Sequence, residues 1–150
     1  MENTFSLDEL TKTLTAIPFN QMLGLTLDTI EDDHIVMSFV MKKDLIGNFF
    51  HGILHGGVIS SVLDMAGGVA AIATAVRKHH GKSIDELKEI LSKTSTVNLN
   101  INFLRPGKGK QFTAKSSVIR SGNKLSFTHM DLQNEEGHLI ATGSATYLIG

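Results

Sequence analysis

The sequence has no cysteine and almost no excess charge. Its 150 residues carry 14 lysine and arginine against 15 aspartate and glutamate, a formal net charge of −1. Without cysteine, disulfides, thiolate catalysis and cysteine-ligated zinc are excluded. A near-neutral chain has no global attraction to nucleic acid, so we expect no nucleic-acid partner.

The first residues of the sequence do not have the composition expected of a signal peptide. MENTFSLDELTKTL is polar and acidic, without the basic start, apolar stretch and small-residue cleavage site of a secretory signal. This composition predicts a cytoplasmic protein. The length of 150 residues predicts one domain, residues 1–150, large enough to bury a core.

One long apolar run, residues 56–76, has about the length of a membrane span. It contains Asp64, four glycines and three hydroxyl residues, which makes it a poor span. A helix that is apolar on every side is typical of a protein core. We therefore predict a buried helix and no membrane partner.

Periodicity, capping signals and turn residues outline the other elements. They predict a helix from Ser6 to about Ala16, strands at 24–30 and 34–41, a loop at 42–54, the long helix from His55 or Gly56 to about His79, a second helix at 83–92, and strands near 94–103, 111–120, 124–133 and 138–149. The late strands predict an antiparallel meander. An α+β fold with a sheet curled around one helix would explain why that helix is apolar all round.

Asp64 is the unusual residue of the long helix. A buried carboxylate without a partner costs several kcal/mol unless it is hydrogen-bonded or protonated. One interpretation is structural, with Asp64 satisfied by a neighbouring backbone or an unseen cation. The other is functional, with a carboxylate held in an apolar pocket as a base or nucleophile.

His55-Gly56-Gly57 stands at the start of the same helix. Glycines there leave bare backbone N–H groups at the positive end of the helix dipole, where they can hold an anion or a developing oxyanion. Asp64 lies about 13 Å further along the helix axis. One reacting carbonyl cannot easily reach both groups on one helix. The spacing therefore suggests a dimer with helices side by side.

These residues, together with the order of elements, resemble a known family, the hotdog-fold acyl-CoA thioesterases of the phenylacetate-degradation type. The resemblance covers nearly the whole chain and rests on Asn48, Gly52, Leu54, His55-Gly56-Gly57 and Asp64. It implies a hotdog fold, in which an antiparallel sheet wraps the long helix and dimers pair sheets edge to edge. It also implies hydrolysis of acyl-CoA to a free fatty or aryl acid and CoA, without metal or cofactor, by a homodimer or a dimer of dimers.

The resemblance assigns roles to five residues. Asp64 would act as general base on water or as nucleophile, and the Gly56 N–H of the other subunit would polarise the thioester carbonyl, helped by Gly57. Asn48 would hydrogen-bond near the reacting centre, although it stands seven residues before the histidine where many relatives have six. Thr96 would orient the water.

Other residues have two interpretations. His55 either takes part in catalysis or braces the turn before the helix. Arg105 and Lys108 either belong to a solvated turn or bind the phosphates of coenzyme A. Phe49 and Phe50 either pack the loop or line an acyl pocket.

Two other functions remain open. The chain could be a non-catalytic acyl-CoA-binding hotdog protein, or a hydratase or dehydratase using His51 or His55. The predicted helix at 83–92 could narrow an acyl channel or extend the surface. The remaining histidines, His79, His80, His129 and His138, show no metal-ligand spacing and are expected at the surface.

Overall fold

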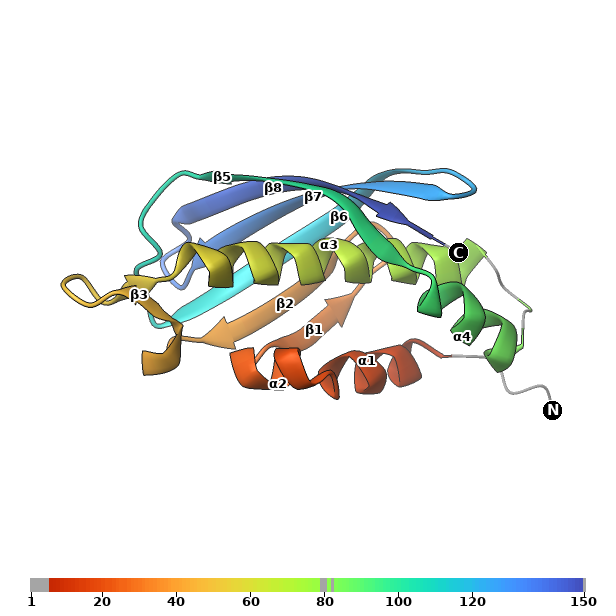
Figure 1. The fold of residues 1–150 in the computed structure, drawn as a ribbon, viewed down its shortest axis with the longest axis horizontal. Helices are drawn as coiled ribbons and strands as arrows, with labels where there is room; N and C mark the ends of the chain where they lie inside the picture. Colours follow the sequence, from red (N-terminus) through yellow and green to blue (C-terminus); the bar gives the residue numbers. More distant parts are fainter. Residues whose placement is uncertain (1–5, 79–80, 82, 150) are drawn as a thin grey trace.

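The computed structural model describes residues 6–78, 81 and 83–149. It confirms the predicted α+β architecture, in which one long helix lies across a curved antiparallel sheet (Figure 1). The predictions for His79 and His80 fall outside the described residues.

The N-terminus folds into two helices rather than the one predicted. The first is α1 (Leu7–Thr15), which begins as expected with the Ser6 hydroxyl accepting the Glu9 N–H at 3.2 Å. The second, α2 (Pro18–Leu23), was not predicted because Pro18 was taken only as a stop. Pro18 stands in the first turn of α2, where a missing N–H costs nothing, and Gly24 ends α2 with a left-handed φ of 70°.

The main sheet has six strands in the order β1-β2-β6-β7-β8-β5, and every pair is antiparallel. The strands are β1 (Thr26–Ile30), β2 (Ile35–Val40), β5 (Ser95–Phe103), β6 (Gln111–Ser121), β7 (Leu125–Asn134) and β8 (Leu139–Leu148). Three of the late strands form the predicted meander, but β5 does not join it beside β6. It pairs with β8 instead, because the turn at residues 104–110 carries the chain back to β2. This leaves β5 at an edge of the sheet.

The long helix is α3 (Gly56–Lys78), which runs across the concave side of the sheet (Figure 1). By length and hydropathy it could cross a membrane. It instead packs on the inward side chains of β2, β5, β6, β7 and β8, as the prediction of a core helix requires. The prediction that it is buried all round is wrong for one stripe. Asp64, Met65, Gly68 and Ile72 are only half-buried, since the sheet covers one side of α3.

The segment predicted as a loop, residues 42–54, has structure of its own. A short 3₁₀ helix, η1 (Lys43–Leu45), leads into a small hairpin of β3 (Ile46–Asn48) and β4 (Ile53–Leu54). These strands were missed because they are too short for a period of two to show. The hairpin projects at the N-terminal end of α3 (Figure 1).

The predicted second helix is present as α4 (Ile84–Ser92), at the opposite end of α3 from the hairpin (Figure 1). Ser83 caps it by accepting the Glu86 N–H at 3.3 Å, as the capping signal predicts. Leu87 is buried beneath it, so α4 packs against the body of the protein. The chain then enters β5 directly.

Candidate active site

Asp64 is half-buried on α3 and has two hydrogen-bond donors. Thr96 donates its hydroxyl to Asp64 Oδ1 at 2.9 Å. The single hydroxyl proton of Tyr147 is shared between the Asp64 carbonyl oxygen at 2.7 Å and Asp64 Oδ1 at 3.1 Å. The partners of Asp64 are thus side-chain hydroxyls, rather than the neighbouring backbone or cation that the structural interpretation named. Two hydroxyls from neighbouring strands fix the orientation of the carboxylate.

Tyr147 was missed by the sequence analysis. It is the only tyrosine of the chain, it is 2% exposed, and it stands directly opposite Thr96 across the β5–β8 pair. Burial first, and then the negative charge of Asp64, raise the pKa of its hydroxyl far above the ordinary value. The hydroxyl therefore keeps its proton and remains a donor. Its inward position in the alternating pattern of β8 was the available signal.

Gly67 makes room for this tyrosine. A Cβ at position 67 would collide with the Tyr147 hydroxyl and would lie 3.0 Å from Thr128 Oγ1. Glycine inside a helix suggests that another group approaches its backbone closely. At Gly67 that group is the side chain of Tyr147, which hydrogen-bonds Asp64.

The N-terminus of α3 presents a different arrangement. His55 Nδ1 accepts the Gly57 N–H at 2.8 Å, so His55 caps the helix and the Gly57 amide is already used. The Gly56 N–H has no acceptor within the described part of the chain. It lies in a groove of about 360 Å³ lined also by Phe103, Leu104 and Arg105.

The hairpin before α3 places three predicted residues at its end. Asn48 is half-buried, and its side-chain oxygen accepts the Phe50 N–H at 3.0 Å, so it shapes the turn. Phe49 and Phe50 are 89% and 96% exposed. Within one chain these two rings neither pack the loop nor line the cavity that contains Asp64.

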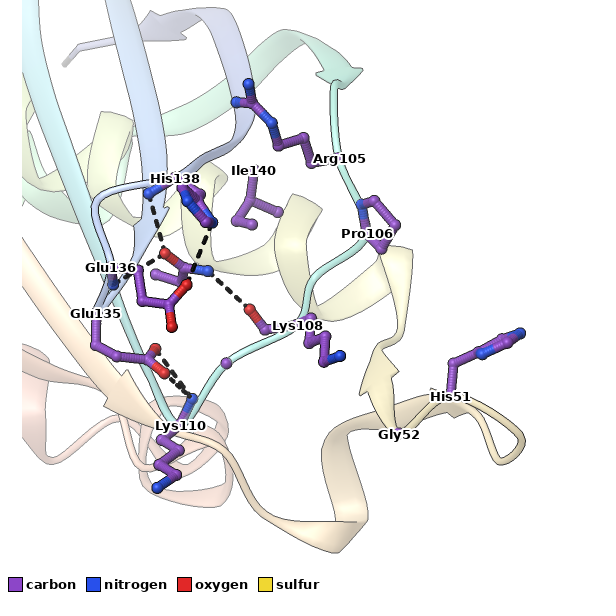
Figure 2. A pocket seen from close by; sticks show the side chains of 12 residues that line it. His51, Gly52, Arg105, Pro106, Lys108, Lys110, Glu135, Glu136, His138 and Ile140 are labelled. Carbon is purple, nitrogen blue, oxygen red and sulfur yellow. Dashed lines mark hydrogen bonds and ion pairs between the residues drawn. The ribbon is translucent and has the colours of Figure 1, made fainter.

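Arg105 and Lys108 lie on a larger cavity of about 670 Å³ at the ends of the strands (Figure 2). Lys110 adds a third positive charge, and Glu135 and Glu136 add two negative ones. Backbone N–H groups, including that of Lys110, hydrogen-bond the Glu135 carboxylate and lower its pKa. The cavity therefore keeps a small excess of positive charge.

The framework of this cavity is built by Asn134. Its side chain donates to the Lys108 carbonyl at 2.9 Å and accepts the N–H groups of Glu136 and His138. Arg105 is held by a 3.0 Å hydrogen bond to the Leu139 carbonyl. Two strand-end turns are thus tied together around the basic side chains.

The predicted residues form two separate groups. The cavity that contains Asp64 and Thr96 shares no lining residue with the Gly56 groove or with the basic cavity, whereas these last two share Arg105 and Pro106. Within one chain, Gly56 and Arg105 therefore line one groove, and Asp64 and Thr96 line another cavity. The two groups do not face a common cavity.

The histidines at described positions fall outside the cavity of Asp64. His51 and His138 line the basic cavity, and exposed His129 lies 3.0 Å from Asp131 on the outer face of the sheet. Among the described residues, no cluster of histidine, aspartate or glutamate could hold a metal ion.

Comparison with known proteins places this arrangement in a family. The model of the thioesterase superfamily matches residues 51–141. The medium/long-chain acyl-CoA thioesterase YigI of Escherichia coli is 41% identical over 134 residues, covering 89% of this chain and 86% of YigI.

Solved structures agree with that match. A Shewanella oneidensis protein related to the thioesterase superfamily has a TM-score of 0.91 and 39% identity, covering 96% of this chain and 95% of its own. The Escherichia coli PaaI protein of the phenylacetic acid degradation operon shares the fold, with a TM-score of 0.76 at 16% identity, over 96% of this chain and 92% of its own. The chain belongs to the hotdog-fold thioesterase superfamily.

Proposed function

We propose that this chain is a single-domain acyl-CoA thioesterase that uses Asp64 as its catalytic carboxylate. The observation that carries the proposal is the pair of hydroxyl donors, Thr96 and Tyr147, aimed at one carboxylate beside an apolar cavity. Such a carboxylate is fixed in direction and has a second oxygen free for chemistry. The 41% identity to the acyl-CoA thioesterase YigI supports the substrate class.

In the proposed reaction, water adds to the thioester carbonyl carbon and the carbon–sulfur bond breaks. Asp64 takes a proton from that water and the departing thiolate receives one, so the products are a carboxylic acid and free CoA. The alternative role for Asp64 is direct attack on the carbonyl, followed by hydrolysis of the anhydride. In both, Thr96 holds the carboxylate and its hydroxyl oxygen can accept a hydrogen bond from the water.

The carbonyl oxygen needs a donor where negative charge develops, and the Gly56 N–H suits this role. It has no acceptor among the residues that the structure describes, and it stands at the positive end of a long helix. Since Gly56 and Asp64 line different cavities of one chain, the two would meet only if a second copy supplies one of them. The edge position of β5 supports a homodimer paired edge to edge, and such dimers could pair again.

The remaining predicted residues fit the same dimer. Arg105 and Lys108, in the cavity that continues from the Gly56 groove, would bind the phosphates of coenzyme A, and Gly57 would support the cap that presents Gly56. Phe49 and Phe50 are too exposed to act within one chain and would cover the acyl group bound to the partner subunit. Asn48 and His55 would hold the turn that carries this surface.

The proposal is tested by thiol release from butanoyl-, octanoyl-, dodecanoyl- and benzoyl-CoA. We expect release by the natural protein and a loss of at least about a thousandfold in kcat for Asp64→Asn. The amide oxygen of asparagine can still accept from Thr96 and Tyr147, so folding and dimerisation should persist in circular dichroism and gel filtration. Near-normal hydrolysis by Asp64→Asn would refute the role of Asp64.

A further inference from the structure

The cavity beside Asp64 is polar at one end and apolar over the rest of its wall. It holds about 180 Å³. The polar end is formed by Asp64, Thr96 and the hydroxyl of Tyr147. The apolar wall comes from Leu14 in α1, from Ile17 just before α2, and from Met65, Val69 and Ile72 in α3.

The cavity extends in one direction from Asp64. All the α3 residues that line it stand at or after position 64, the last being Ile72, which places them along about 12 Å of the helix axis. This cavity adjoins the Asp64 carboxylate directly, whereas the Gly56 groove of the same chain shares no lining residue with it. The acyl part of a thioester reacting at Asp64 can therefore lie against this apolar wall, while a second copy supplies the Gly56 amide and the groove for the CoA part.

Gly68 leaves space in this cavity because it has no side chain. A Cβ at position 68 would meet only the Tyr147 ring, at 3.5 Å and 4.0 Å, which are ordinary contacts. Packing therefore does not require glycine here, in contrast to Gly67, and the helix itself would favour alanine. The space above Gly68 belongs to the cavity.

We propose that this cavity receives the apolar acyl chain, and that Gly68 and Ile72 set the length of chain accepted. The proposal rests on the proposed thioesterase function and assigns the tail-binding part of that site. A longer linear chain buries more of its methylenes against Leu14, Ile17 and Ile72, and each buried methylene strengthens binding by about fourfold. A side chain added at position 68 occupies that space.

The test measures binding in the Asp64→Asn background, where substrate persists. Titration calorimetry with free CoA, butanoyl-CoA and octanoyl-CoA gives the gain in affinity with chain length. We expect Gly68→Leu to reduce the octanoyl-to-butanoyl affinity ratio by at least about tenfold while leaving the affinity for free CoA within about twofold. Val76→Leu is the matched control, because Val76 is half-buried on α3 and lies outside this cavity.

A second variant covers the case in which Gly68→Leu folds poorly. Ile72→Ala enlarges the cavity from its half-buried far end and should raise the dodecanoyl-to-octanoyl affinity ratio several-fold. Ratios in both cavity variants equal to those of Val76→Leu would overturn the proposal. These ratios do not depend on turnover, so absence of thiol release by the natural protein would defeat the proposed function without deciding where the acyl chain binds.

Discussion

The middle of α3 and its N-terminus differ in how many of their hydrogen-bond partners and apolar contacts come from the same chain. Around Asp64, Thr96 and Tyr147 supply hydrogen bonds, and an apolar wall adjoins the carboxylate. At the N-terminus, the Gly56 N–H has no acceptor among the described residues, and the nearby Phe50 ring is almost wholly exposed. The first region is preorganised within the chain, whereas the second presents its groups to something outside it.

This difference suggests a division of the substrate between two copies. The Gly56 groove continues into the cavity of Arg105 and Lys108, so one copy would hold the CoA part and polarise the carbonyl. The other copy would supply Asp64 and the wall for the acyl chain. Helices related by a twofold axis that crosses them at right angles run antiparallel, which brings the start of one helix toward the middle of the other.

After the loss expected for Asp64→Asn, the next largest effect in this comparison is expected at Gly56. Gly56→Pro removes the free N–H, and proline is tolerated at the first position of a helix, so α3 should still form. Loss of one oxyanion donor lowers kcat by about a hundredfold to a thousandfold. Steady-state thiol release with octanoyl-CoA measures this effect.

Gly56→Ala is the matched control for that substitution. It keeps the N–H, and its Cβ would meet the Phe103 ring at 3.4 Å, which a small ring movement relieves. We expect kcat within about threefold of the natural protein, since the donor is retained. Equal losses in the proline and alanine variants would mean that the backbone N–H is not the important group.

A smaller effect is expected at Tyr147. Tyr147→Phe keeps the ring in place under Gly67 but removes the donor to Asp64, and a hydrogen bond to a charged group is worth about 1.5–3 kcal/mol. We expect kcat to fall by about tenfold with KM little changed. An unchanged kcat in Tyr147→Phe would leave Tyr147 with a packing role only.

The smallest predicted effect is spectroscopic and concerns Tyr147 alone. Since the chain has one tyrosine and no tryptophan, ultraviolet titration reports on this hydroxyl only. Its raised pKa predicts no ionisation in the folded protein at pH 10, the ordinary value. The corresponding stability is present below pH 10 and is lost as the pH rises toward the folded-state pKa.

The same titration of Asp64→Asn tests the contribution of Asp64 to the pKa of Tyr147. The negative charge of Asp64 contributes to the raised pKa of Tyr147, second to burial, so its removal should let the tyrosine ionise at lower pH than in the natural protein. Identical titration curves for the two proteins would contradict the electrostatic contact between Asp64 and Tyr147.

Much of the fold was predictable because its signals are local. The caps at Ser6 and Ser83 marked two helix starts, and both are confirmed. The alternation of 97–103 marked a strand, but a strand pattern does not say which neighbour it pairs with, so the place of β5 beside β8 was not foreseen. The helix begun by Pro18 was missed because the same residue can stop one helix and start another.

Residues of the candidate site were predictable only where a sequence motif or the spacing between residues pointed to them. The family resemblance pointed to Thr96, and its hydroxyl contacts Asp64. Tyr147 is 83 positions from Asp64 along the chain, and no local pattern connects them. The use of the Gly57 amide by His55 depends on the rotamer of a side chain, which the sequence does not reveal.

The central claim, that Asp64 and Gly56 act from different copies, is tested most directly by mixing two inactive variants. Asp64→Asn and Gly56→Pro chains carrying different affinity tags are coexpressed, and the mixed dimer is purified through both tags. If each site combines two copies, the mixed dimer has one intact site and should show about half the natural kcat per dimer. If each site lies within one chain, both chains remain defective, and activity at the level of the parent variants would contradict the account.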